Sequence, residues 1–598
     1  MKDFFKYMMA TICGIVVLSL IGGLLLVLTF MGILAGSDSK KKAPENSVFV
    51  LKLEGTVDER ADDLSPLLSM VSPVNMDQYG LDDILKAIRL ARNEENIKGI
   101  YLEGGTATFD SPATAQQIRD ALADFQKSGK WVMAYADQYM QTCYYLCSVA
   151  DSLFLNSTGM IDFKGMGGKN MYWTGLYEKL GIKYQVARVG KYKSYVESET
   201  RKDMSEEDRE QRIALWGGIW KQMTEQIAES RKTTAAQLDQ LANDSILLFA
   251  STDDYVAARL IDRTFYPDEM QNVIRRQLKI DQDEEISQLT LKDMLNLKPA
   301  KKVREKGEQV AVYYAYGQIV DDVMDGFYSG HNIVGREMSA DLKALADDDQ
   351  VKAVVIRVNS PGGSAAASEQ IWHAIQLLKQ EKPVVISMGG VAASGGYMIS
   401  CGSDYIFAEP STITGSIGIF GMIPNFNGLV TQKLGITWDG AVTNKYTDYE
   451  TNLVFGDENS DEMRYLQSYT DRGYEQFLSI VAGGRGMTKD EVNEIAQGRV
   501  WLATDALDIK LVDELGSLND AVKKAAKLAK LDEYHTASYP EEKEWLDQLM
   551  DDKEKPGTYL DAQLKQMLGD FYEPVMQLRE EQLCNRLQAR LPFPTSVQ

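Results

Sequence analysis

Residues 384–421 read VVISMGGVAASGGYMISCGSDYIFAEPSTITGSIGIFG, and this stretch decides the fold more than any other part of the chain. It opens with an apolar, β-branched run and passes into glycines and alanines around Ser394, which predicts a buried strand that turns into a helix. Small neighbours would let a substrate backbone approach the Ser394 hydroxyl, and the helix N-terminus behind it would favour developing negative charge. The stretch therefore predicts an α/β fold with a candidate nucleophile at a strand-to-helix turn.

A second glycine-rich strand end lies upstream. Residues 354–364 read VVIRVNSPGGS, another apolar run that ends in a glycine pair. The N–H groups of Gly362 and Gly363 could form half of an oxyanion hole. Either segment alone is equally well explained as a tight turn. The two together, about 30 residues apart, favour a nucleophile with its oxyanion hole.

The composition describes a globular protein and excludes several classes of function. The chain has 598 residues, of which 44% are hydrophobic and 25% charged, so two or three folded domains are expected rather than disorder. A net charge of −23 without a basic stripe argues against nucleic acid as a partner. The five cysteines show no zinc spacing, and Cys143 and Cys147 predict one buried helix face. No metal site, cofactor motif or disulfide framework is predicted.

The N-terminus predicts a membrane anchor. No charged residue occurs between Tyr7 and Ser37, and residues 8–35 are almost wholly apolar. This run is longer than the roughly 20 residues that span a bilayer, which favours an uncleaved transmembrane helix over a cleaved signal ending near Ala35. Lysines lie on both sides of the run, so the positive-inside contrast is poor.

Beyond the anchor the chain repeats itself. Segments that begin at Ser47, Asn96, Cys143 and Lys179 recur at an offset of 253 to 262 residues, beginning at Gln309, Gln350, Gly396 and Lys433. Short buried strands alternate in each copy with helical stretches such as 113–126 and 365–380, which predicts a largely parallel sheet flanked by helices. The predicted parts are an N-terminal tail (1–7), an anchor (8–35), a linker (36–46), a first α/β repeat (47–296), a charged linker (297–308), a second α/β repeat (309–535) and a helical C-terminal extension (536–598).

The two copies differ where chemistry is expected. Aligning them places Gln141 opposite Ser394, and the first copy has no Pro-Gly-Gly. Lys191 has a counterpart in Lys445, which suggests a shared structural role, whereas Lys193 has none. This division favours one active site assembled between the halves. The alternative is drift after duplication, with Lys193 an ordinary surface lysine.

The combined motifs identify a resemblance to a family. Together they resemble the long, two-domain form of signal peptide peptidase A, a family of membrane-anchored serine proteases with a Ser–Lys dyad. The resemblance spans about residues 47 to 530. The motifs that carry it are ARVGKYKSYVES (187–198), VNSPGGS (358–364), GGVAASGGY (389–397), PSTITGSIGIFG (410–421) and GRVWLATDALDIKLVDELG (498–516).

This resemblance implies a fold, an assembly and a location. The fold would be two tandem repeats similar to Clp protease subunits and crotonases. Long members of the family form dome-shaped homotetramers that face the extracytoplasmic side. The resemblance therefore implies a single-pass membrane protein whose bulk lies on the periplasmic side of an inner membrane, with the lipid bilayer contacted through residues 8–35.

The resemblance also implies roles for individual residues. Ser394 matches the nucleophile, Lys193 the general base, and Ser416 a serine that hydrogen-bonds the lysine amine. Oxyanion N–H groups would come from Gly395 and from Gly362 or Gly363. One departure from the family's pattern is Lys191, which adds a second positive charge near the proposed base.

The chemistry requires a neutral lysine. A solvated lysine has a pKa near 10.4, so about one in 2,500 is neutral at pH 7. Burial lowers this pKa, and repulsion from Lys191 could lower it further if that side chain points inward. His373 is the rival base, on the helix that follows the oxyanion loop.

The leading predicted function is proteolysis of short apolar peptides near a membrane, with signal-peptide remnants as the substrates that the family implies. One alternative is a crotonase-like acyl-CoA enzyme, which would use a carboxylate pair and need neither Ser394 nor Lys193. The other is an inactive membrane-anchored scaffold of peptidase descent.

Overall fold

The computed structural model describes residues 42–61, 78–297, 307–322, 331–457, 460–541 and 588–590. The predicted anchor at 8–35 and most of the linker at 297–308 lie outside these ranges. Within them, no helix combines the length and the apolar character needed to cross a bilayer.

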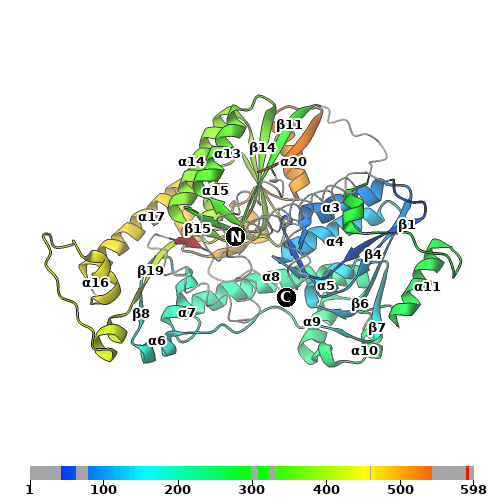
Figure 1. Ribbon diagram of the computed structural model, residues 1–598, viewed down its shortest axis with the longest axis horizontal. Helices are drawn as coiled ribbons and strands as arrows, with labels where there is room; N and C mark the ends of the chain where they lie inside the picture. Colours follow the sequence, from blue (N-terminus) through cyan, green and yellow to red (C-terminus); the bar gives the residue numbers. More distant parts are fainter. Residues whose placement is uncertain are drawn as a thin grey trace, which may run out of the picture.

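A parallel sheet forms the centre of the first repeat, at the lower right of Figure 1. Its order is β10-β1-β4-β6-β7-β9. Alternate residues of β1 enter different cores: Phe49 and Leu51 pack with helices α3 and α4, whereas Val48 and Val50 pack with α11 on the other face. The element bounds are β10 (Gln288–Leu289), β1 (Ser47–Lys52), β4 (Ile97–Glu103), β6 (Trp131–Tyr139), β7 (Ser152–Ile161), β9 (Arg263–Phe265), α3 (Leu81–Asn93), α4 (Pro112–Gln126) and α11 (Pro267–Leu278).

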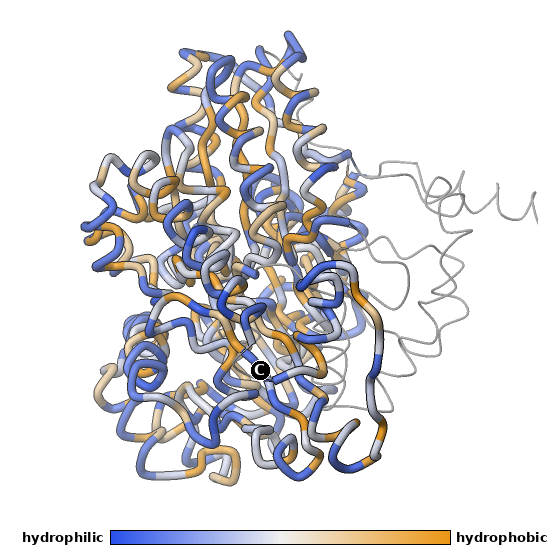
Figure 2. The backbone as a smooth tube through the Cα atoms, turned by 90° about the vertical axis from the view of Figure 1, so that its left-hand side faces the viewer, coloured by the Kyte–Doolittle hydropathy of each residue, from blue (hydrophilic) through white to orange (hydrophobic). Residues whose placement is uncertain are grey.

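The second repeat has the same plan and forms the upper lobe of Figure 1. Strands β11, β14, β16 and β17 pair in the order of β1, β4, β6 and β7, with α13 and α14 on one face and α20 on the other. Hydrophobic segments run through the interior of this lobe (Figure 2). The bounds are β11 (Glu308–Tyr316), β14 (Val351–Ser360), β16 (Val384–Ala393), β17 (Tyr405–Ala408), β18 (Ile413–Gly415), β20 (Val500–Leu502), β21 (Glu514–Leu515), α13 (Gly335–Asp347), α14 (Ala365–Glu381) and α20 (Leu518–Leu528).

The predicted helices at 113–126 and 365–380 are α4 and α14, to within one residue at each end. The predicted helix face with Cys143 and Cys147 is α5 (Gln141–Cys147), which is wholly buried. The common strand order and these helices confirm the prediction of two tandem α/β repeats.

The prediction of a helical C-terminal extension from residue 536 is wrong for the part that the structure describes. Thr536 lies inside β22 (Tyr534–Tyr539), which pairs in parallel with the outer edge of β11. Residues 588–590 form another strand, β23 (Gln588–Arg590). An open sheet edge offers unpaired N–H and C=O groups, and these two segments satisfy such groups as strands.

A third sheet joins the two repeats. Its order is β13-β12-β15-β23-β19-β8, with β13 (Asn332–Val334), β12 (Gln318–Val320), β15 (Gly362–Ser364), β19 (Ile419–Asn425) and β8 (Lys183–Val189). Strand β8 comes from the first repeat and runs antiparallel to β19 of the second, from Lys183 opposite Asn425 to Val189 opposite Ile419. This pairing places the segment that follows β8 against the second repeat.

A buried ion pair also links the repeats. Arg357 of β14 is 1% exposed, and its Nε donates to Oε1 of Glu59 from the first repeat at 2.6 Å. The guanidinium also donates to Gln117 Oε1 at 3.1 Å and to Ser387 Oγ at 3.0 Å. Asn359 donates to the other oxygen of Glu59 at 3.2 Å. Since β14 leads directly to the Gly362 turn, this cluster fixes that turn relative to the first repeat.

Glu59→Ala is expected to destabilise the chain by about 3–5 kcal/mol, because it removes the carboxylate that pairs directly with the buried guanidinium and leaves it with Glu409, whose Oε1 lies 3.8 Å from Arg357 Nη1. Urea unfolding of the full-length chain in detergent, followed by tryptophan fluorescence, measures the change. The exposed Glu95 supplies the control, and Glu95→Ala should shift stability by less than about 0.5 kcal/mol. Equal stability of the Glu59→Ala and wild-type chains would contradict the role assigned to the pair.

Candidate active site

Ser394 lies at the turn between β16 and α15 (Gly395–Ser400), as the sequence predicts. Its backbone has φ 57°, a left-handed conformation that is uncommon for a residue with a side chain, and its N–H donates to Gly415 O at 2.8 Å. A Cβ at Gly396 would lie 2.6 Å from Ser360 O, so this turn requires glycine. Ser394 has no exposed surface.

Lys193 reaches Ser394 from the other repeat. It follows β8 by four residues, and Tyr192 just before it donates its N–H to Gln497 O at 2.9 Å. The Lys193 Nζ lies 2.8 Å from Ser394 Oγ. Lys193 is also fully buried, so it is not a surface lysine.

Ser416 supplies the remaining contacts of the amine. Both its Oγ and its carbonyl oxygen lie 3.1 Å from Lys193 Nζ. Its backbone has φ 49°, and its N–H donates to Arg499 O at 2.6 Å, which fixes both oxygens. The sequence-predicted residues Ser394, Lys193 and Ser416 therefore meet at one buried point.

The surroundings of the amine favour its neutral form. All three partner atoms are hydroxyl or carbonyl oxygens, and no described carboxylate forms an ion pair with it. Burial therefore holds the pKa of Lys193 well below its usual range. A neutral amine can donate to Ser416 and accept a hydrogen bond from the Ser394 hydroxyl, so its geometry suits proton abstraction.

The three predicted oxyanion glycines lie beside this point. Gly362 has φ 94°, and a Cβ there would lie 2.6 Å from Gly395 N. A Cβ at Gly395 would in turn lie 3.3 Å from Gly363 N. The two strand-end turns thus bring their backbone amides together next to Ser394.

Lys191 does not meet the condition for repulsion, because its side chain does not point inward. Lys191 is exposed, and its Nζ lies 4.9 Å from the centre of the Tyr192 ring, so burial alone lowers the pKa of Lys193. Its counterpart Lys445 lies over Tyr446 in the same way, at 4.8 Å, which agrees with a shared structural role. The rival base His373 is exposed on α14, whereas Ser394 is buried.

Gln141 shows what the first repeat does at the position aligned with Ser394. Its Oε1 accepts from Lys164 N at 2.9 Å and Gly165 N at 3.0 Å, and its Nε2 donates to Gly165 O at 3.1 Å. These hydrogen bonds hold the loop at Lys164 and Gly165 against α5, so the Gln141 side chain has a structural function.

Three glycines that the sequence analysis missed hold the Lys193 segment. A Cβ at Gly498 would lie 2.7 Å from Lys193 N, and one at Gly418 would lie 3.3 Å from Lys193 Cδ. A Cβ at Gly190, which has φ 108°, would lie 2.5 Å from the Gln497 backbone. These glycines let two backbones from different repeats approach closely. All three glycines lie in the family motifs at 187–198, 410–421 and 498–516, but the spacing of these motifs does not reveal the contacts between them.

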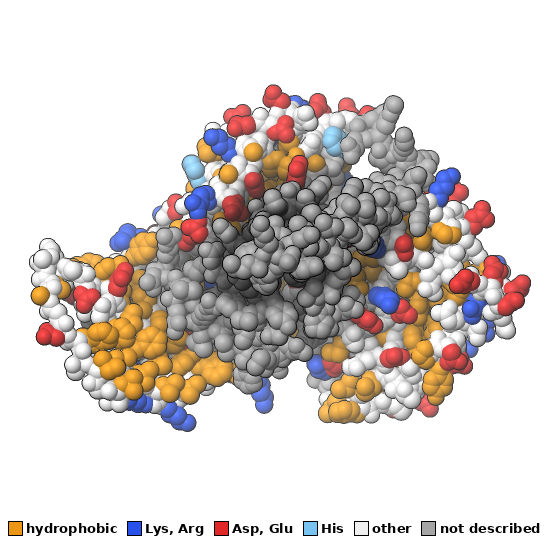
Figure 3. Space-filling view, viewed as in Figure 1, with side chains coloured by type: hydrophobic (Ala, Val, Ile, Leu, Met, Phe, Trp, Pro, Cys, Tyr) orange, Lys and Arg blue, Asp and Glu red, His pale blue; other side chains and the backbone are white. Residues whose placement is uncertain are grey.

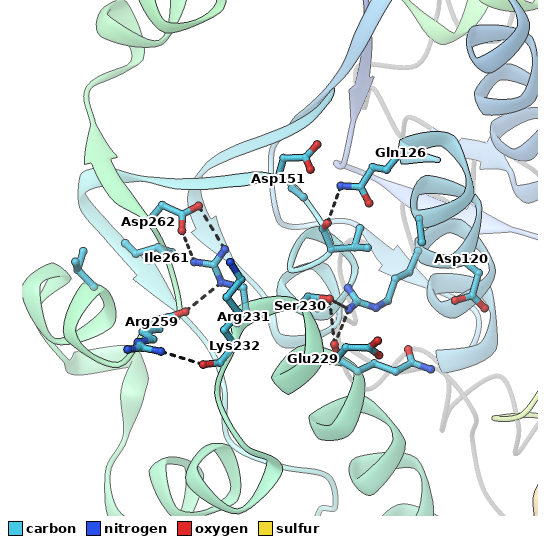
Figure 4. A pocket seen from close by; sticks show the side chains of 16 residues that line it. Asp120, Gln126, Asp151, Glu229, Ser230, Arg231, Lys232, Arg259, Ile261 and Asp262 are labelled. Carbon is cyan, nitrogen blue, oxygen red and sulfur yellow. Dashed lines mark hydrogen bonds and ion pairs between the residues drawn. The ribbon is translucent and has the colours of Figure 1, made fainter. Parts of the chain in front are cut away.

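A separate polar pocket of about 870 Å³ lies in the first repeat (Figure 4). Two of its arginines are paired within the repeat: Arg231 Nη2 donates to Asp262 Oδ1 at 2.7 Å, and Arg119 donates to Ser148 Oγ and Ser230 Oγ. None of the residues predicted for the active site lines it.

Gly498→Ala is expected to lower the reactivity of Ser394 about a hundredfold, because a methyl at φ 77° would displace Lys193. The rate of labelling by a fluorophosphonate measures this reactivity. Gly483, where a Cβ would meet nothing within 4 Å, provides the matched control Gly483→Ala. Wild-type labelling by a folded Gly498→Ala chain would contradict the packing argument.

Comparisons with known proteins agree with this architecture. The model of Peptidase family S49 matches twice, over residues 124–281 and 376–532, and the Clp protease model matches residues 330–412. The double match reproduces the internal repeat. The Clp protease match supports a Clp-protease-like α/β fold.

Curated relatives match most of the chain. "Protease 4" of Salmonella typhi is 34% identical over 529 residues, which cover 86% of this chain and 84% of that protein. "Protease 4" of Haemophilus influenzae is 34% identical over 534 residues, which cover 85% and 83%. "Serine protease SPPA, chloroplastic" of Arabidopsis thaliana is 28% identical over 446 residues, which cover 74% and 64%. The chain therefore belongs to peptidase family S49, as a serine protease of the long, two-repeat signal peptide peptidase A type.

Proposed function

We propose that the chain is a membrane-anchored endopeptidase that uses Ser394 as nucleophile and Lys193 as general base. The observation that carries this proposal is the 2.8 Å contact between Lys193 Nζ and Ser394 Oγ in a site without a carboxylate partner. A lysine amine kept neutral by burial can take the proton of a serine hydroxyl without histidine.

The reaction proceeds in two halves. Ser394 Oγ attacks the scissile carbonyl carbon while its proton passes to Lys193 Nζ, and the resulting ammonium gives that proton to the leaving amine. Water, deprotonated by the same amine, then attacks the acyl carbonyl carbon, and the ammonium returns the proton to Ser394 Oγ as the ester bond breaks. Ser416 holds the amine in line throughout, through the contacts of its Oγ and carbonyl oxygen.

The oxyanion is stabilised by backbone amides of Gly395 and Gly363. Between the two candidates in the upstream turn, Gly363 is favoured because the Gly362 N–H donates to Ser360 Oγ at 3.2 Å. Stabilisation by these amides requires no metal, and among the described residues no His, Cys, Asp or Glu cluster suits one.

The proposed substrates are short apolar peptides, such as signal-peptide remnants, at a membrane surface. Residues 8–35 would anchor the chain in the bilayer, with the two repeats on the periplasmic side of an inner membrane. The apolar anchor is the feature of the sequence that supports this location.

A homotetramer is the proposed assembly. Hydrophobic side chains gather at the lower left of Figure 3, over α6 (Thr174–Leu180), β8 and the segment before α16 (Tyr449–Phe455). Contiguous exposed apolar surface of this kind favours contact with another molecule. The exposed residues include Met171, Leu176, Leu180, Leu434, Ile436 and Trp438.

The two alternatives fit the site less well. A crotonase-like acyl-CoA enzyme would have no use for a buried amine on a serine hydroxyl. An inactive scaffold would have no reason to retain the Lys193 contact together with the strained backbone of Ser394.

Ser394→Ala and Lys193→Ala are each expected to lower kcat/KM at least about 10³-fold, because each removes one partner of the proton transfer. Hydrolysis of a fluorogenic peptide by the full-length chain measures the loss. Lys191→Ala is the matched control, since Lys191 is exposed and lies over Tyr192, and it should retain most activity. Near wild-type turnover by a folded Ser394→Ala or Lys193→Ala chain would exclude the dyad.

The pH profile gives an independent test. Since the protonated amine cannot act as a base, kcat/KM should rise with pH through a pKa below the ordinary value near 10.4. His373→Ala should leave this limb unchanged, because that side chain is exposed on α14. A rising limb that disappears in His373→Ala, or persists in a partly active Lys193→Arg chain, would contradict a lysine base.

A further inference from the structure

Helix α8 (Glu206–Arg231) contributes one buried amide to the segment that carries Lys193. It is the long helix in the lower half of Figure 1. The amide belongs to Gln211, in the second turn of the helix, which is 1% exposed. Its side chain is therefore closed to substrate, and any effect that it has on the reaction acts through other residues.

The nitrogen of this amide holds the chain on both sides of Lys193. Gln211 Nε2 lies 3.1 Å from Tyr192 O and 3.1 Å from Ser194 Oγ. Asp208 Oδ1 lies 2.9 Å from the same nitrogen and accepts from Ser194 Oγ at 2.5 Å. The donor end of Gln211 thus fixes where the backbone of Lys193 lies.

The oxygen of the same amide holds the second repeat. Gln211 Oε1 accepts from Val500 N at 3.3 Å. Val500 pairs with Gly415 in antiparallel register, and Gly415 O accepts the N–H of Ser394 at 2.8 Å. One amide therefore connects directly to the segment of the lysine and, through strands β20 and β18, to the backbone of the serine.

These two contacts require a side chain that ends in both a donor and an acceptor. The amide of Gln211 has both, whereas a carboxylate of the same length only accepts and a thioether donates nothing. The orientation of the amide is also determined. Exchanging its two end atoms would set the nitrogen against the N–H of Val500 and the oxygen against Tyr192 O.

We propose that Gln211 is a positioning residue that sets the distance between Lys193 Nζ and Ser394 Oγ by holding the segments of both groups with one amide. The proposal rests on the proposed function of these two residues. Proton transfer needs the base within hydrogen-bond reach, and a misplacement of about 1 Å can lower a rate about a hundredfold. Without the amide, water also reaches the Lys193 amine, and hydration returns its pKa toward the ordinary value near 10.4.

Gln211→Met keeps the length of the side chain and removes both contacts. It is expected to lower kcat for a fluorogenic peptide about thirtyfold with KM unchanged. It should also move the rising limb of kcat/KM to higher pH by about one unit, because the base stays protonated to a higher pH. Gln211→Leu provides a second substitution without an amide, and the same two changes are expected of it.

Gln222→Met is the matched control. Gln222 lies about 16 Å further along the axis of the same helix and donates to Pro410 O of the second repeat at 3.2 Å. The control therefore also removes an amide contact between the repeats, and it should match wild type in kcat and in pH profile. Wild-type kcat in a folded Gln211→Met or Gln211→Leu chain would overturn the proposal. A fall in kcat without a shift of the limb would overturn it as well, because lost packing alone gives that result.

The ionisation of Lys193 separates this proposal from the catalytic one. In full-length Ser394→Ala chains labelled with ε-13C lysine, carbon NMR follows the titration of Lys193 Cε, identified as the signal that Lys193→Met removes. Adding Gln211→Met is expected to raise the pKa of Lys193 by about one unit, and adding Gln222→Met to leave it unchanged. The same Lys193 pKa with and without Gln211→Met would overturn the positioning role, even if Ser394 proves to be the nucleophile. A raised pKa would support that role, even if Ser394→Ala retains turnover.

Discussion

The burial of one lysine amine is the constraint on which the site depends. An ammonium ion without a carboxylate partner costs several kcal/mol to bury, so burial holds the pKa of Lys193 well below its usual range and favours a neutral amine with three oxygen partners. The second repeat encloses the Lys193 side chain, in part through Gly418 and Gly498. The buried environment of the proposed base therefore forms only when the two repeats are docked, and the pairing of β8 with β19 serves that docking.

Duplication explains how such a site is divided. Both repeats keep the same central strand order, but each has specialised. The first repeat uses Gln141 to close a loop at the position aligned with Ser394, and it supplies Lys193. The second keeps the serine and both glycine turns. The Arg357–Glu59 pair forms in only one arrangement of the repeats, so it fixes their register as well as contributing a contact.

Much of the fold and of the candidate site was predictable from sequence, because local sequence patterns determine these features. The turn at Ser394, helices α4 and α14, and the repeat itself follow from apolar runs, glycines and internal similarity. The contact of Gly498 with Lys193 was not predictable, because it joins residues distant in the sequence. The direction of the Lys191 side chain was left open by the sequence, because it depends on the Tyr192 ring, over which its ammonium has a favourable exposed position. The C-terminal segment was expected to be helical, but sheet edges made elsewhere in the chain pair with it as strands.

The separation along the chain of the two groups proposed to react has a consequence for biosynthesis. Lys193 precedes Ser394 by 201 residues, and the glycine that seats it, Gly498, is made later still. A ribosome that has finished the serine has not yet finished the wall that buries the lysine. A nascent chain in this state holds a solvated, protonated lysine and an unactivated hydroxyl. Under the proposed mechanism, synthesis order alone thus keeps an unfinished protease from cutting its own emerging chain or its neighbours.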